Sequence, residues 1–233
     1  MTDRIDWSAV RAYFPILQRE VHGKPLVYLD SANTAQKPAA VIDAVDGFYR
    51  RHNANVSRAV HQLGAEATEA YEGARRKIAA FFNIHADDLV LTSGTTQSIN
   101  LVAYSFALPR LRKDDVILVT RMEHHANMVP WQLIAERTGA RIVPVEITAG
   151  GEIDLPALKA QLQAPVRILA LSHVSNVLGT VNPVAQICDW ARKAGVVTVI
   201  DGSQAAPHMP VDIPALGCDF YAFTGHKMCG PTG

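Results

Sequence analysis

The stretch VVTVIDGSQAAP, residues 196–207, decides the fold class. It opens with an apolar run of strand length, ends that run at Asp201 and continues into the small residues of a turn. A run that is apolar throughout is typical of a strand buried on both faces, as in parallel sheets covered by helices. An aspartate is costly to bury there without a positive partner, so we expect a cationic ligand group, a metal ion or a helix cap at Asp201.

The same pattern recurs along most of the chain. After Asp88, short apolar runs alternate with helical segments, which indicates β-α units. The predicted strands are residues 89–91, 116–120, 142–145, 166–172, 196–200 and 220–223. The predicted helices between them are residues 95–106, 130–137, 155–162 and 183–193. We therefore expect an α/β fold with a mainly parallel sheet flanked by helices.

The part before Asp88 is predicted to be mostly helical. The expected elements there are a short helix at 6–14, a strand at 25–29 and helices at 38–51 and 64–82. We interpret residues 1–24 as an N-terminal helical segment and residues 25–233 as one large domain.

Composition narrows the class of protein. The chain has 233 residues, 48% of them hydrophobic, which is enough for a sizeable core. Lys and Arg total 22, as do Asp and Glu, and this balance argues against nucleic acid or an anionic membrane as partner. Without an apolar run of membrane length or a signal peptide, we expect a soluble, cytoplasmic protein. Cys188, Cys218 and Cys229 lack the paired spacing of disulfide frameworks or zinc knuckles.

Polar residues follow the predicted strands, where open α/β sheets bind their ligands. These residues are Ser93–Thr96, Glu123–His125, His173–Asn176, Asp201–Gln204 and Thr224–Lys227.

Two of these segments suggest specific chemistry. Ser93–Thr96 suits a phosphate, although Thr95 also fits a plain helix N-cap. No nucleotide-type glycine pattern is present, which disfavours nucleoside triphosphates and dinucleotides. Lys227 follows a buried strand, and a desolvated lysine becomes a neutral amine that attacks carbonyls.

Together these segments resemble the group II cysteine desulfurases (SufS- and CsdA-like) of the class V aminotransferase family. That family has the fold of type I enzymes that use pyridoxal 5′-phosphate (PLP). The segments that carry the resemblance are LDSANTAQKP (29–38), GTTQSINLVA (94–103), MEHHANMVPWQ (122–132), LSHVSNVLGTVNP (171–183), VIDGSQAAPHMPVD (199–212) and DFYAFTGHKMCGPTG (219–233). They occur in family order and cover almost the whole chain, so residues 25–233 would be the PLP-binding large domain.

The resemblance implies a role for each site residue. Lys227 would bind the PLP aldehyde covalently and later move protons, and Asp201 would pair with the pyridine nitrogen. His124 would lie against the ring and act as an acid or base. Gln204 would bind the phenolic oxygen, and Asn176 would contact cofactor or substrate. The phosphate would be held by Thr95, Thr224 and His226, with Thr96 as a weaker candidate.

The implied reaction converts L-cysteine to L-alanine and passes the sulfur, as a persulfide, to an acceptor protein for iron–sulfur cluster assembly. The family implies a homodimer. A selenocysteine lyase acting on L-selenocysteine, or another class V enzyme (kynureninase-like or aminotransferase-like), remains an alternative. Two more distant alternatives are a non-catalytic module that binds PLP or a partner, and a metal hydrolase that uses His124, His125, Asp201 and His226.

Some features depart from the family pattern. Family members extend well beyond the equivalent of Gly233 and hold their persulfide cysteine and a carboxylate-binding arginine there. We therefore expect this polypeptide alone to be poorly stable and inactive. Ser57, Asn33 and Cys229 also differ from the usual residues, which leaves the substrate preference open. Cys188 is expected to be buried in its helix.

Overall fold

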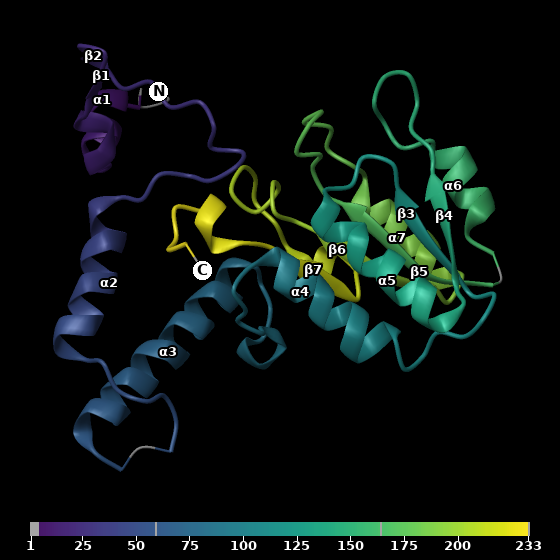
Figure 1. Cartoon of the computed structure of the whole chain (residues 1–233), viewed down its shortest axis with the longest axis horizontal. Coiled ribbons are helices and arrows are strands. Elements are labelled where there is room, and N and C mark those ends of the chain that lie inside the picture. The colour runs from purple at the N-terminus through teal and green to yellow at the C-terminus, as the bar shows by residue number, and fades with distance from the viewer. Residues whose placement is uncertain (1–4, 59, 164, 233) are drawn as a thin grey trace. The chain divides into compact units, whose positions relative to one another are not determined.

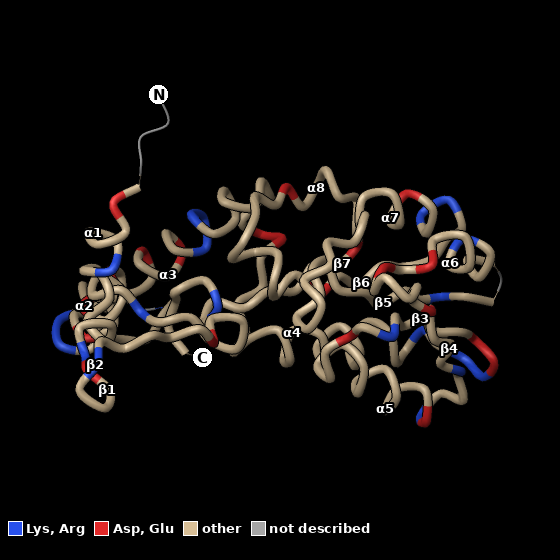
Figure 2. The backbone as a smooth tube through the Cα atoms, turned by 90° about the horizontal axis from the view of Figure 1, so that it is seen from above, with Lys and Arg blue, Asp and Glu red and all other residues tan. Residues whose placement is uncertain are grey.

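The structure, a computed structural model, describes residues 5–58, 60–163 and 165–232. The chain divides into two compact units. The sheet unit is Ala79–Thr224, and the helical unit consists of the described residues of Met1–Ile78 and Gly225–Gly233. Lys and Arg residues are interspersed with Asp and Glu residues along the described chain (Figure 2), in keeping with a formal net charge of zero.

A five-stranded parallel sheet organises the sheet unit, in the order β4-β3-β5-β6-β7. The strands are β3 (Val116–Thr120), β4 (Arg141–Val145), β5 (Val166–Ser172), β6 (Val197–Asp201) and β7 (Phe220–Ala222). Because all run in the same direction, their carboxyl ends meet at one edge of the sheet.

Helices cover both faces of this sheet (Figure 1). They are α4 (Thr95–Leu101), which continues as the π-helical η3 (Val102–Ala107), α5 (Val129–Thr138), α6 (Leu155–Gln161), α7 (Val184–Lys193) and the short α8 (Ile213–Leu216). Side chains of β3 alternate between two cores. Ile117 and Val119 pack with residues of α4 and α5, whereas Val116 and Leu118 pack with residues of α6 and α7. The predicted α/β fold with a mainly parallel sheet is therefore confirmed.

The helical unit is built from shorter elements. They are α1 (Trp7–Ala12), η1 (Pro15–Gln18), the antiparallel pair β1 (Glu20–Val21) and β2 (Lys24–Pro25), α2 (Ala39–Arg51), most of α3 (Gln62–Phe81) and η5 (Gly225–Lys227). The carboxylate of Asp6 caps α1 by accepting from the backbone N–H of Ser8 at 2.9 Å.

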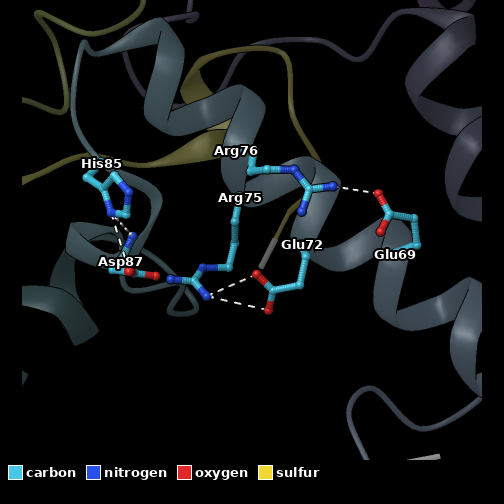
Figure 3. A network of polar contacts seen from close by, with 6 residues as sticks. All are labelled: Glu69, Glu72, Arg75, Arg76, His85 and Asp87. Carbon is cyan, nitrogen blue, oxygen red and sulfur yellow. Dashed lines mark hydrogen bonds and ion pairs between the residues drawn. The ribbon is translucent and has the colours of Figure 1, made fainter.

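Ion pairs line the exposed side of α3. Figure 3 shows Arg75 paired with Glu72 at 3.2 Å and Arg76 paired with Glu69. Partly exposed pairs of this kind contribute little to stability, on the order of 0.5 kcal/mol each. The helix therefore depends more on packing than on these charges.

Two predicted strands are wrong. Leu89 has an extended backbone (φ −94°, ψ 118°), but no strand pairs with residues 89–91 among the described residues, and Val90 is 65% exposed. Of residues 25–29, only Pro25 lies in a strand, and the side chains of Val27 and Leu29 are exposed. An apolar run becomes a strand only where a second strand satisfies its backbone groups.

Candidate cofactor-binding site

Asp201 is the last residue of β6 and is buried. In the sheet register it lies opposite Ser172 of β5 on one side and Ala222 of β7 on the other. Its Oδ1 accepts a hydrogen bond from the backbone N–H of Ser203 at 2.9 Å. The sheet therefore holds a carboxylate in a fixed orientation at the edge where its strands end.

A side chain larger than that of glycine at position 202 would force Tyr221 to move. A Cβ at this position would lie 2.1 Å from the ring of Tyr221, and the N–H of Gly202 donates to the oxygen of Ala222 at 2.7 Å. The Tyr221 hydroxyl in turn lies 3.0 Å from Nδ1 of His173. Burial raises the pKa of Tyr221. The aromatic ring thus packs directly against the backbone that follows Asp201.

Thr95 and Thr224 meet around Gly94. Gly94 has φ +143°, and a Cβ there would lie 3.3 Å from the hydroxyl oxygen of Thr224. Thr95 is buried at the first position of α4, and its Oγ1 accepts a hydrogen bond from the Ser203 hydroxyl at 2.8 Å. Gly94, not Thr95, is the N-cap residue, so the interpretation of Thr95 as a plain cap is wrong. Thr96 is exposed.

His124 is exposed directly after the β3 turn, and its Nδ1 accepts from the backbone N–H of Ala126 at 3.1 Å. A neutral imidazole whose Nδ1 accepts must carry its hydrogen on Nε2. The local fold therefore sets His124 as a donor through Nε2. His125 is also exposed, and the two ring centroids are 6.1 Å apart.

Glu123 is a half-buried acidic residue that the sequence patterns identified only as part of a segment at a strand end. Its Oε1 accepts from the Thr120 hydroxyl and, at 2.9 Å, from the N–H of Ser172. Its Oε2 accepts from Nδ2 of Asn127 at 2.6 Å, and Oδ1 of Asn127 accepts from the indole N–H of Trp131 at 3.1 Å.

These bonds tie the loop that contains His124 to the carboxyl end of β5. Burial raises the pKa of Glu123 to about 7, with a smaller contribution from nearby Asp201, and outweighs the three donors that favour the charged form. An acidic residue three positions after the end of a buried strand is the signal in the sequence that points to Glu123.

Two predicted residues in this unit have less support. Asn176 is exposed in the loop after β5, and Gln204 is buried in the turn after β6, where its backbone oxygen lies 2.6 Å from Nδ1 of His208. Their roles stay predictions.

Lys227 and His226 belong to the helical unit, in η5. The backbone oxygen of His226 accepts from the N–H of Ala35 at 3.1 Å and from the ammonium group of Lys37 at 2.8 Å. Its Nδ1 lies 3.1 Å from the hydroxyl of Thr34. The segment with the predicted cofactor lysine is therefore anchored by residues 34–37.

The pKa of His226 is lowered, first by burial and then by the charges of Lys227 and Lys37. A lowered pKa keeps the imidazole neutral near pH 7. His226 is thus a neutral hydrogen-bonding group beside two lysines.

The three cysteines are free thiols. Cys188 is fully buried in α7, as predicted, and burial raises its pKa to about 11. Burial likewise raises the pKa of Cys218 to about 12. Neither thiol has the character of a nucleophile at neutral pH.

Among the residues that the structure describes, no three His, Cys, Asp or Glu side chains are grouped to hold a metal ion. None of the described helices combines the length and apolarity needed to cross a membrane.

The chain is similar to known proteins of one family. The model of the family described as aminotransferase class-V matches residues 27–233. A probable cysteine desulfurase of Xylella fastidiosa (strain Temecula1) is 66% identical over 228 residues, which cover 98% of this chain and 55% of that protein. A probable cysteine desulfurase of Halalkalibacterium halodurans is 50% identical over 227 residues, or 96% of this chain and 55% of that protein.

Solved structures of two cysteine desulfurases have a similar fold. The cysteine desulfurase CsdA of Escherichia coli has a TM-score of 0.88 and 43% identity, over 99% of this chain and 57% of that chain. The apo cysteine desulfurase of Thermococcus onnurineus NA1 has a TM-score of 0.92 and 33% identity, over 100% and 56% of the two chains. This chain spans about half the length of the curated relatives it matches. The resemblance drawn from the sequence motifs is confirmed.

Proposed function

Because the chain belongs to the aminotransferase class-V family, we propose that the protein binds PLP and acts as a cysteine desulfurase on L-cysteine. The observation that carries this proposal is the buried carboxylate of Asp201, held at the end of β6 by the N–H of Ser203. A buried carboxylate requires a positive partner, and a protonated pyridine nitrogen is such a partner. The relatives named cysteine desulfurases support the substrate class.

The described residues of the sheet unit fit this cofactor. Gly94 and Gly202 bring backbone close to Thr224 and Tyr221, and any larger residue would fill the space at both positions. Gly94 lies beside the hydroxyl groups of Thr95 and Thr224, and Gly202 directly follows Asp201. This is the donor and acceptor set that a phosphate and a pyridine nitrogen require.

We assign the binding residues as follows. Asp201 holds the ring nitrogen and keeps it protonated, and Gln204 binds the phenolic oxygen. Lys227 binds the aldehyde, and Asn176 contacts cofactor or substrate. The phosphate is bound by Thr95, Thr96, Thr224 and His226.

When bound, PLP supplies an electron sink for negative charge at the substrate α-carbon. We assign His124 to the ring as an acid or base, as the resemblance implies; in the structure its Nε2–H is available to donate a hydrogen bond, because its Nδ1 accepts from the N–H of Ala126. Lys227 serves as the amine that accepts and returns protons.

The finer assignments rest on the resemblance. Under this proposal residues 25–233 belong to the PLP-binding large domain, and the protein acts in the cytoplasm as a homodimer. In the proposed reaction a protein thiolate attacks the sulfur of L-cysteine and forms a persulfide as the Cβ–S bond breaks. The remaining three-carbon unit gains a proton and leaves as L-alanine, and a sulfur-acceptor protein takes the sulfur toward iron–sulfur cluster assembly. L-Selenocysteine is the alternative substrate.

The test uses the full-length protein mixed with PLP. We expect a visible absorbance band, and borohydride reduction should fix the cofactor on the peptide that contains Lys227. Lys227→Arg should abolish both the fixation and the release of alanine from L-cysteine. Lys193→Arg is the matched control, because Lys193 is an exposed residue of α7 paired with Asp189. An activity that needs no PLP and is lost with a chelator would instead support a metal hydrolase.

A further inference from the structure

Ser203 connects two parts of the sheet unit through two different groups. Its backbone N–H donates to Oδ1 of Asp201 at 2.9 Å, and its hydroxyl donates to Oγ1 of Thr95 at 2.8 Å. All three residues are buried. Thr95 lies 108 positions earlier in the chain, so Ser203 joins the start of α4 to the end of β6.

In the contact between the Ser203 and Thr95 hydroxyl groups, Ser203 is the donor and Thr95 is the acceptor. A hydroxyl group has one hydrogen to donate and lone pairs that accept. Since Oγ1 of Thr95 accepts from Ser203, its own hydrogen is left for a second partner. In a phosphate site that partner is a phosphate oxygen, which accepts and cannot donate when fully ionised.

The contact between Ser203 and Asp201 occupies only one of the two carboxylate oxygens of Asp201. Because Oδ1 accepts from the N–H of Ser203, the carboxylate cannot rotate freely, and Oδ2 remains for another donor. A backbone donor persists when the side chain at 203 is changed. The two contacts of Ser203 can therefore be separated by mutation.

We propose that Ser203 is a positioning residue that directs the Thr95 hydroxyl toward the cofactor phosphate while its backbone N–H holds Asp201 for the ring nitrogen. The inference rests on the proposed function and adds a residue that the sequence motifs do not assign. Removal of the hydroxyl should weaken recognition of the phosphate and leave recognition of the ring intact.

The experiment compares PLP with pyridoxal, which lacks the phosphate, by equilibrium dialysis against the full-length protein. For Ser203→Ala we expect about fivefold weaker binding of PLP, the effect of roughly one hydrogen bond, and unchanged binding of pyridoxal. Ser203→Cys, a weaker donor of similar size, should show a smaller loss in the same direction. In a Thr95→Val background, Ser203→Ala should have no further effect on the binding of PLP.

Thr198→Val is the matched control. It removes a buried hydroxyl from the other end of β6, where Thr198 bonds Asp219, and should leave the ratio of the two affinities unchanged. Equal weakening of PLP and pyridoxal binding by Ser203→Ala, or no weakening of either, would overturn the inference. Failure of the wild-type protein to bind either compound would instead overturn the proposed function.

Discussion

The ammonium group of Lys37 donates a hydrogen bond to the backbone oxygen of His226 at 2.8 Å, and it also donates to the oxygen of Ala35. One side chain therefore joins the turn after residue 34 to the segment that contains Lys227. The same charge contributes to the lowered pKa of His226, after burial and the charge of Lys227.

Replacing Lys37 by Met should raise the pKa of His226 toward its ordinary value without restoring it fully, since burial remains. Lys37→Arg keeps the charge and should leave the pKa low. A pH titration of the His226 ring signals by NMR measures the change. Lys24→Met, an exposed residue of β2, is the control, and equal titration curves for Lys37→Met and wild type would contradict the assignment.

Glu123 should make the protein less stable as the pH rises from about 4.5 to about 7. The folded state keeps the proton of Glu123 in this range, while the unfolded chain releases it. The free energy of unfolding therefore falls with pH, by at most about 1.4 kcal/mol per pH unit, and levels off above about 7.

Glu123→Gln carries no proton to lose and should lack this decline. Urea unfolding at pH 5, 6, 7 and 8 measures the difference between variant and wild type. Glu152→Gln, at an exposed position, should follow the wild-type curve. Parallel curves for Glu123→Gln and wild type would show that Glu123 titrates normally.

Gly202→Ala should destabilise the protein by about 1–3 kcal/mol, because the new methyl group would overlap the ring of Tyr221. Gly73→Ala is the control. Its Cβ would meet only the ends of Arg76 and Glu69 at 3.7 and 3.9 Å, and alanine in a helix is favoured by about 1 kcal/mol. Thermal unfolding of Gly202→Ala and Gly73→Ala measures the change in stability of each variant relative to wild type. If the overlap is the cause, Tyr221→Ala should cost less in the Gly202→Ala background than in wild type.

Thiol modification should distinguish the three cysteines. At pH 8 a thiol reagent should leave Cys188 and Cys218 unmodified in the folded protein, since burial keeps both protonated. Both should react after unfolding in urea. Cys229→Ser identifies the contribution of the third thiol, and mass spectrometry of the labelled peptides assigns each site. Rapid labelling of Cys188 in the folded state would contradict its burial.

Local sequence patterns predicted most of the sheet unit. Residues 116–120 and 166–172 form strands with the expected bounds, because a mostly apolar run of strand length is buried where both faces of the sheet are covered. Residues 89–91 have a similar pattern and form no strand, because strand formation depends on a partner elsewhere in the chain. An apolar run favours a strand locally, whereas burial and strand pairing depend on the whole sheet, and Val90 of this run is exposed.

In the candidate site, too, some features could be predicted from the sequence and others depend on the folded chain. Asp201 and Thr95 could be found from their positions after apolar runs. The bond between Ser203 and Thr95 could not, since it joins residues more than a hundred positions apart. Glu123 was visible as an acidic residue after β3, but its raised pKa follows from burial beside β5, which only the folded chain specifies.

Hydrogen bonds link Glu123 through Asn127 to Trp131, and this link connects the charge of Glu123 to the fluorescence of Trp131. The indole of Trp131 is fully buried and lies two hydrogen bonds from the carboxyl group of Glu123. When Glu123 gains a proton, the bond from Asn127 weakens, and the electric field at the indole changes with it. We therefore expect the intrinsic fluorescence of Trp131 to change as Glu123 gains or loses its proton.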